Sequence, residues 1–234
     1  MEKTVLDQAD GLRRLMAASG HAAAASVPAR RVAVINSAPD GAPACAVTQE
    51  LMAALILKGQ QVLLLNERGG PQSLPPQRDG RLVLLDAVPG PDGALSPLAA
   101  SADTVLVVFQ ATAAAITQAY LCIKKLHAAQ APTPLWVLVE EAEDIDQANR
   151  MLTNLCAASA RYLGIHLRRA GFVRADPLLA QARQLGLPVV QAFSAGPAAQ
   201  DFCQIAAELL QWPQPCTAAP ASVRAGQAAL SGAH

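Results

Sequence analysis

The sequence predicts an α/β protein with a doubly wound, mostly parallel sheet. Short apolar runs rich in Val, Ile and Leu alternate along the chain with longer stretches of helical periodicity. This alternation is typical of a parallel sheet that carries helices on both faces. The first apolar run leads through a loop with Gly and Pro into a helical stretch, which is the order of elements at a nucleotide-binding edge.

Six runs are predicted to be fully buried strands because each is short and apolar. They are residues 32–35, 62–65, 82–85, 105–109, 135–139 and 170–173. Helical periodicity predicts helices over residues 47–58, 113–128, 145–163, 177–185 and 198–210. Right-handed crossovers between strands then produce the doubly wound arrangement.

The chain is predicted to have four segments. Residues 1–20 form a separate helix, and residues 21–29 form a linker rich in Ala. Residues 30–211 form the α/β domain. Residues 212–234 form a flexible tail, because their Ala and Pro content cannot build a core.

Composition excludes several classes of protein. The 234 residues are 52% hydrophobic and 15% charged, which favours a folded domain over a disordered chain. Eighteen basic and eighteen acidic residues provide no net field for nucleic acid or anionic lipid, so we expect no nucleic-acid partner. The five cysteines form no Cys-x-x-Cys pair and lack histidines at ligand spacing, which predicts reduced thiols and no metal site. We also expect no signal peptide and no transmembrane helix, since the apolar runs are short.

The N-terminal helix has one apolar stripe. Val5, Ala9, Leu12 and Met16 recur at helical spacing. Gly11 in the interior costs about 1 kcal/mol relative to Ala, so we expect this helix to be marginal alone and to form on docking. Two alternatives follow. The stripe packs against its own domain, or the helix is a tethered peptide for the groove of a partner.

The loop after the first strand has the position of a phosphate-binding loop without its residues. Residues 36–45 read Asn-Ser-Ala-Pro-Asp-Gly-Ala-Pro-Ala-Cys and contain no lysine or arginine. Such a loop uses a lysine for the phosphate charge and a Ser or Thr hydroxyl for magnesium. Phosphoryl transfer depends on positioning and charge stabilisation, so we expect this site to have little catalytic power.

A family resemblance begins in the N-terminal helix. Residues 7–13 read Asp-Gln-Ala-Asp-Gly-Leu-Arg and resemble the DQAxGLR element of the flagellar-number regulators FlhG (FleN), which are MinD/ParA-type deviant Walker ATPases. The resemblance continues over residues 37–59 (the phosphate loop and its helix), 82–90 (switch II), 116–120 and 170–188. It implies a P-loop NTPase-like fold of the MinD/ParA type, preceded by a docking helix.

The resemblance also identifies what the nucleotide loop lacks. By position, the family's signature lysine falls on Pro39, its Walker lysine on Ala44 and its magnesium-binding hydroxyl on Cys45. Ser37 and Gly41 remain as members of the degenerate loop. The resemblance therefore implies a pseudo-ATPase.

Positions outside the loop depart from the family as well. A loop glycine becomes Pro43, the paired aspartates of the next strand fall on Asn66 and Arg68, and the adenine-reading Asn falls on Glu140. Asp86 is retained in switch II, where it is either a residual nucleotide-site residue or a polar residue that ends a strand. We expect no cofactor in place of the family's ATP-Mg, and no resident metal.

The N-terminal helix carries the implied function. In the family this helix docks on the signal-recognition-type GTPase FlhF, and the Gln of the element assists GTP hydrolysis in trans, which makes Gln8 the catalytic residue here. The partner-binding residues on the same helix are Val5, Asp7, Gln8, Ala9, Gly11, Leu12, Arg13 and Met16. The implied role is regulation of flagellar biosynthesis, number and placement by a protein that is not itself an ATPase.

Two other functions stay open. One is an active ATP-binding MinD-like ATPase with an unconventional loop, and the other is a scaffold or interaction protein of flagellar assembly. Flagellar basal-body and transcription-regulatory proteins are further candidate partners. We expect a cytoplasmic protein that reaches the cell pole through its partners and contacts the membrane only weakly or indirectly, because the C-terminal segment has no clear apolar face.

Overall fold

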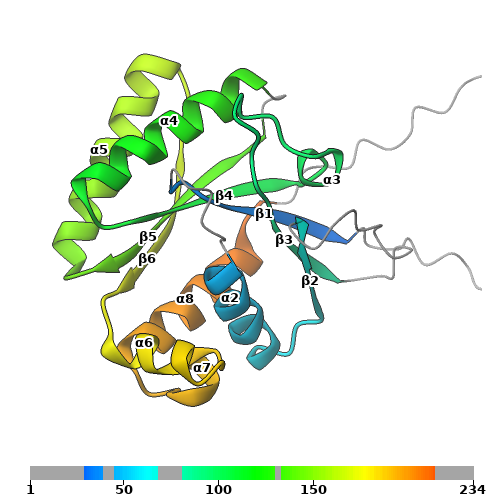
Figure 1. Ribbon diagram of the computed structural model, residues 1–234, viewed down its shortest axis with the longest axis vertical. Coiled ribbons are helices and arrows are strands. Elements are labelled where there is room, and N and C mark those ends of the chain that lie inside the picture. Colours follow the sequence, from blue (N-terminus) through cyan, green and yellow to red (C-terminus); the bar gives the residue numbers. More distant parts are fainter. Residues whose placement is uncertain (1–28, 39–44, 68–80, 130–132, 214–234) are drawn as a thin grey trace, which may run out of the picture.

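The computed structural model describes residues 29–38, 45–67, 81–129 and 133–213. A six-stranded parallel sheet lies between two layers of helices (Figure 1). The strand order is β2-β3-β1-β4-β5-β6. The strands are β1 (Arg30–Asn36), β2 (Val62–Asn66), β3 (Leu82–Asp86), β4 (Thr104–Gln110), β5 (Leu135–Ala142) and β6 (Arg168–Arg174). The predicted doubly wound α/β class is confirmed.

Helices cover both faces of the sheet. One face carries α2 (Cys45–Leu57), α6 (Pro177–Gln184), α7 (Val189–Ala192) and α8 (Pro197–Gln211). The other face carries α3 (Pro97–Ala100), α4 (Ala113–Ala129) and α5 (Ile145–Leu163). The five predicted helices are confirmed within two residues at each end, whereas the four-residue helices α3 and α7 were not predicted.

The central strands bury both faces, as a parallel sheet between helices requires. In β1, Val32 and Val34 face the α2 and α8 layer, and Ala33 and Ile35 face the α4 and α5 layer. The prediction that all six strands are fully buried is wrong for the two edge strands. Four of the five residues of β2 are only partly buried, and β6 begins with two exposed arginines. The reason is that an edge strand has a neighbour on one side only.

The amino end of the sheet is closed by two tryptophans. Trp136 at the start of β5 and Trp212 after α8 stack with ring centroids 3.8 Å apart. The guanidinium groups of Arg30 and Arg168 lie 5.9 and 5.6 Å from the two ring centroids, of Trp212 and Trp136 respectively. Arg30 also donates a 2.7 Å hydrogen bond to the carbonyl of Leu209. Trp212 is only 4% exposed, so it belongs to the folded domain rather than to the tail that the sequence predicted.

The other predicted segments lie outside the described residues. These are the N-terminal helix at 1–20, the linker up to residue 28 and the tail beyond residue 213, and they stay predictions. Within the described ranges, no helix combines the length and the apolar character that crossing a membrane requires.

Candidate functional site

The site begins where β1 ends, at the centre of the carboxyl edge of the sheet. The main-chain N–H of Ser37 donates to the carbonyl of Val108 in β4, which extends the ladder by one residue. The side-chain Oδ1 of Asn36 accepts the N–H of Ala38 at 3.0 Å, so an Asx-type turn leads the chain away from the sheet. The hydroxyl of Ser37 is buried and has no hydrogen-bond partner among the residues that the structure describes.

The predicted order of strand, loop and helix is present here. The next described residue is Cys45, at which α2 begins. Pro39, Gly41 and Ala44 lie outside the described residues, and so do Gln8 and the other predicted partner-binding residues of the N-terminal helix. The assignments of these residues stay predictions.

The polar ends of the neighbouring strands β2 and β3 lie at one level. Asp86 is the last residue of β3, is 1% exposed, and aligns with Asn66 of β2 and with Val34 of β1. Asn66 and Asp86, two family positions that the sequence singled out, are therefore adjacent at the carboxyl edge. Arg68, the third, lies outside the described residues.

The chain after β3 forms a tight wall beside this edge. The N–H of Gly90 donates to the carbonyl of Ala94 at 2.8 Å, which closes a turn. Gly93 in this turn has a φ of 89°, and a Cβ at this position would lie 2.5 Å from the backbone carbon of Lys125 in α4. The turn therefore packs directly on α4, and only glycine fits at that contact.

Glu67 ties this wall to the end of β2. One oxygen of its carboxylate accepts the main-chain N–H of Val88 at 3.3 Å. The other accepts a hydrogen bond from the hydroxyl of Ser96. Ser96 in turn caps α3 by accepting the N–H of Ala99 at 3.1 Å. The carboxylate of Glu67 thus helps to fix the loop between β3 and α3.

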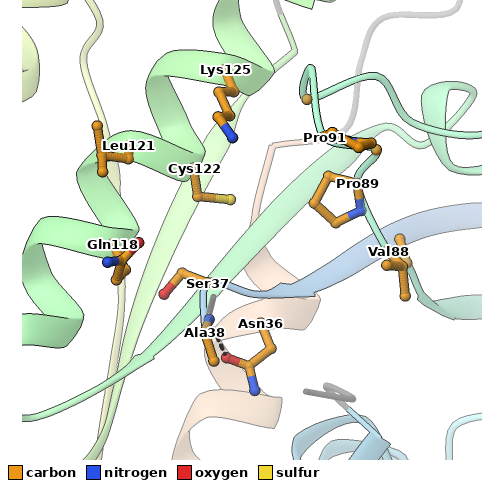
Figure 2. Close-up of a pocket in the computed structure, with 13 residues that line it drawn as sticks. Asn36, Ser37, Ala38, Val88, Pro89, Pro91, Gln118, Leu121, Cys122 and Lys125 are labelled. Atoms are coloured by element: carbon orange, nitrogen blue, oxygen red, sulfur yellow. Dashed lines mark hydrogen bonds between the residues drawn. The ribbon is translucent and has the colours of Figure 1, made fainter. Parts of the chain in front are cut away.

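A cavity of about 550 Å³ lies between this wall, the end of β1 and α4 (Figure 2). The α4 side of the cavity carries Gln118, Leu121, Cys122 and Lys125, which recur at helical spacing. Burial raises the pKa of the Cys122 thiol to about 11, so the thiol stays neutral and is a poor nucleophile. The sequence analysis missed this helix face, although its spacing was a readable signal. The remaining lining residues are Asn36, Ser37, Ala38, Ala87, Val88, Pro89, Gly90, Pro91 and Gly93.

Two glutamates occupy the end of β5, on the α2 and α6 side of the edge. Burial raises the pKa of Glu140 to about 7, although the guanidinium of Arg183 lies 3.5 Å away. Glu141 has a φ of 59°, in the left-handed region that non-glycine residues rarely adopt. Its carboxylate also lies near Arg183, at 3.7 Å. Glu140 thus keeps its proton to a higher pH than an exposed glutamate does.

A third glutamate lies on α2. Glu50 is 3% exposed and accepts the main-chain N–H of Val189 at 2.8 Å, which joins α2 to α7. Burial raises its pKa as well. This edge of the sheet is therefore rich in carboxylates. In the part of the chain that the structure describes, however, no group of three or more His, Cys, Asp or Glu side chains is arranged to hold a metal ion.

The arrangement matches known structures. The MinD cell division protein of Aquifex aeolicus aligns with a TM-score of 0.59 at 16% identity, over 80% of this chain and 99% of that one. The chain has the MinD/ParA fold. A MinC:MinD cell division protein complex from the same organism aligns with a TM-score of 0.56 at 16% identity, over 80% and 98%. A ParA family ATPase from Chlorobium tepidum aligns with a TM-score of 0.53 at 10% identity, over 76% and 98%.

The MinD/ParA type of fold that the resemblance implied is thereby confirmed. Identities of this size concern the fold alone, and the flagellar part of the resemblance stays a prediction. Neither a protein-family model nor the sequence of a curated protein matches the chain.

Proposed function

We propose that this protein is a pseudo-ATPase of the MinD/ParA fold that works by binding other proteins. The observation that carries the proposal is the charge of the carboxyl edge, where the family's phosphate-binding loop would hold nucleotide. The acids at this edge are Glu50, Glu67, Asp86, Glu140 and Glu141. Residues 36–45 supply no lysine or arginine to oppose them, and the cation that lines the neighbouring cavity is Lys125 of α4.

This charge distribution disfavours a polyphosphate. Phosphoryl transfer requires cations and donors that are already in place around the transferred group. Arg183, the cation beside Glu140 and Glu141, lies within 4 Å of both carboxylates and is engaged by them. The helix N-terminus at Cys45 retains its backbone donors, but a helix terminus alone is a weak phosphate site beside several carboxylates.

The proposed activity belongs to the N-terminal segment. Its DQAxGLR-like element supports a role in which Gln8 assists GTP hydrolysis by an FlhF-like signal-recognition-type GTPase and so regulates flagellar number and placement. An amide can orient an attacking water without acting as a base. The existence of a MinC:MinD complex supports the idea that this fold presents surfaces to protein partners. We place the protein in the cytoplasm, at the cell pole through its partners.

Two measurements test the proposal. The first is titration of the full chain with ATP and magnesium by calorimetry, for which we expect no saturable binding. Saturable binding would favour the alternative of an active ATPase with an unconventional loop.

The second measurement is GTP hydrolysis by the FlhF-like GTPase with the full chain added. We expect stimulation that Gln8→Ala abolishes while co-purification with the GTPase is retained. Asp10→Ala, on the polar face of the same predicted helix, is the matched control and should stimulate like the wild type. An unstimulated GTPase would instead favour a scaffold of flagellar assembly, with basal-body or transcription-regulatory proteins as partners.

A further inference from the structure

A second hollow lies at the far edge of the sheet, away from the nucleotide-like site. It has a volume of about 530 Å³ and follows the outer side of β6. The start of α5 forms one wall, α8 forms the other, and β6 forms the floor. The lining residues are Glu143, Asp144, Ile145, Ala170, Gly171, Phe172, Arg174, Asp201, Gln204, Ile205 and Glu208. We call it the β6 groove.

The floor of the β6 groove is an open strand edge. Among the described residues β6 pairs with β5 alone, so the backbone groups on its other side face the groove. Asp201 already accepts the main-chain N–H of Arg174 at 2.9 Å, which closes the far end of the strand. The open stretch is therefore residues 170–172. An open strand edge of this kind is a template for an added strand.

The walls come from both helical layers, so the β6 groove lies in the plane of the sheet. Ile205 of α8 can lie close to the strand because Gly171 has no side chain: a Cβ there would be 3.3 Å from Cγ1 of Ile205. On the opposite wall Ile145 is 56% exposed, and Phe172 on the strand is half-buried. Ile145 and Phe172 offer contacts to alternate side chains of an added strand, whereas Ile205 is itself 2% exposed.

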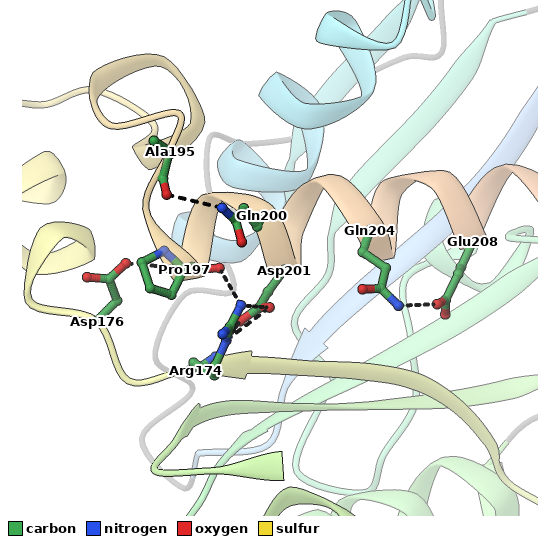
Figure 3. A network of polar contacts seen from close by, with 9 residues as sticks. Arg174, Asp176, Ala195, Pro197, Gln200, Asp201, Gln204 and Glu208 are labelled. Atoms are coloured by element: carbon green, nitrogen blue, oxygen red, sulfur yellow. Dashed lines mark hydrogen bonds and ion pairs between the residues drawn. The ribbon is translucent and has the colours of Figure 1, made fainter.

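The charge of the β6 groove selects its occupant. Its lining has four carboxylates and one guanidinium, which gives a formal charge of −3. The two exposed arginines at the start of β6 lie outside this lining: Arg168 lies over the ring of Trp136, and Arg169 donates a hydrogen bond to Thr153 of α5. The guanidinium of Arg174 is itself bound by both oxygens of Asp201, at 2.8 to 3.2 Å (Figure 3). Along α8 the carboxylate of Glu208 faces the amide of Gln204. A second copy of the chain would bring a second acidic groove to the same edge and would be repelled.

We propose that the β6 groove binds an extended, lysine- or arginine-bearing segment of a partner protein, which adds to the sheet beside β6. Backbone pairing with the strand provides the attachment, and the acidic walls select for basic side chains. This proposal does not depend on the GTPase-activating role. The β6 groove is at another edge of the domain, and the test of this proposal is independent of the test of the GTPase-activating role.

The test is a titration of the ¹⁵N-labelled full chain with two short peptides, followed by NMR. One peptide alternates valine and lysine, and the other alternates valine and glutamate. We expect the lysine peptide to shift the amide signals of Gly171, Phe172 and Gln204 in a saturable manner, and the glutamate peptide to leave them unchanged. Binding should weaken with added salt, because screening reduces attraction between exposed charges.

Charge-reversal variants test whether the lysine peptide binds in the β6 groove. The double variant Glu143→Lys with Glu208→Lys changes two exposed side chains of the β6 groove. It should lower the affinity for the lysine peptide by at least about tenfold. Asp92→Lys reverses an exposed charge in the turn beside α4, at the other half of the sheet, and should leave the affinity unchanged.

Three results would overturn the proposal. They are equal binding of the two peptides, equal weakening by the double variant and by Asp92→Lys, and signal changes confined to residues away from β6. A fourth is a shift of the signals of residues 1–28 in the double variant without peptide, since it would identify this chain's own N-terminal segment as the occupant.

Discussion

The two ends of the sheet differ in their aromatic contacts and in their backbone conformation. At the amino end, Trp136 and Trp212 stack at 3.8 Å and arginines lie close to both rings. At the carboxyl end, Glu140 has a raised pKa, Glu141 has a left-handed backbone, and the buried hydroxyl of Ser37 has no partner within the described ranges. Both ends bury polar atoms that have no partner among the described residues, including Nε1 of Trp212 at the amino end, but the left-handed non-glycine backbone lies at the carboxyl end.

The strained backbone of Glu141 is the feature that distinguishes the carboxyl end. Strain and unpaired polar groups persist in proteins mainly where a site needs them. The carboxyl end has this strained residue, and residues 36–45 of the sequence contain no lysine or arginine. We expect substitutions in the tryptophan stack to lower the free energy of unfolding and substitutions of the buried acid at the carboxyl end to raise it.

Trp212→Ala should remove the aromatic stack at the amino end of the sheet and have the largest effect on stability. Removing a buried tryptophan from a packed position costs about 3 to 5 kcal/mol of the free energy of unfolding, because transfer energy is lost and a cavity remains. Urea denaturation followed by circular dichroism measures this loss. Trp212→Phe retains a ring on Trp136 and should lose clearly less. Equal losses for Ala and Phe would show that the stack contributes little.

Glu140→Gln should increase the free energy of unfolding, and only at higher pH. The folded pKa of about 7 lies above the ordinary value of 4.5, so between these values the folded state binds more protons than the unfolded state. The Glu140 contribution therefore reduces stability as pH rises through this window, by up to about 3 kcal/mol. Relative to the wild type, the Gln variant should gain stability progressively from about pH 4 to about pH 8. Denaturation at a series of pH values measures the gain.

Glu141→Gln is the matched control for that series. It removes the neighbouring carboxylate, which is 45% exposed and also lies near Arg183. We expect a much smaller change with pH from this substitution. A pH dependence as large as that of Glu140→Gln would refute the assignment of the effect to the buried side chain.

Glu141→Gly should have the smallest effect, a gain of about 0.5 kcal/mol over Glu141→Gln. Glycine adopts positive φ without the Cβ clash, and part of this gain is offset by the greater freedom of glycine in the unfolded chain. Gly164→Ala tests the converse, because Gly164 ends α5 with a φ of 68°. That substitution should cost about 1 kcal/mol. Thermal unfolding of the variants gives both numbers.

Much of the fold could be predicted because hydrophobic periodicity records burial directly. The α5 helix has the predicted bounds, since Asp144 caps its start and Gly164 its end. The helix α3 could not be predicted in this way, because four residues are too few to show a helical periodicity. Its only sequence signal is Ser96-Pro97, which is typical of the start of a helix. Trp212 was misplaced because its burial depends on Trp136, and a stack between distant residues has no local pattern.

The site was predictable only in part, for a similar reason. The absence of lysine and arginine from residues 36–45 and the presence of the acids Asp86 and Glu140 can be read from single positions. The roles that the resemblance implies for these positions stay predictions. The cavity beside α4 cannot be read in this way. Its shape arises because Gly93 brings a turn against Lys125, and that contact depends on tertiary packing.

The tryptophan stack also gives the protein a built-in optical reporter. The whole sequence contains only two tryptophans, and both lie in this one pair. With excitation selective for tryptophan, the fluorescence of the folded chain therefore comes from one place, where the end of α8 meets the sheet. It should change when α8 detaches and stay constant when a ligand arrives at the opposite edge, so an unchanged emission spectrum is no sign that a ligand has failed to bind.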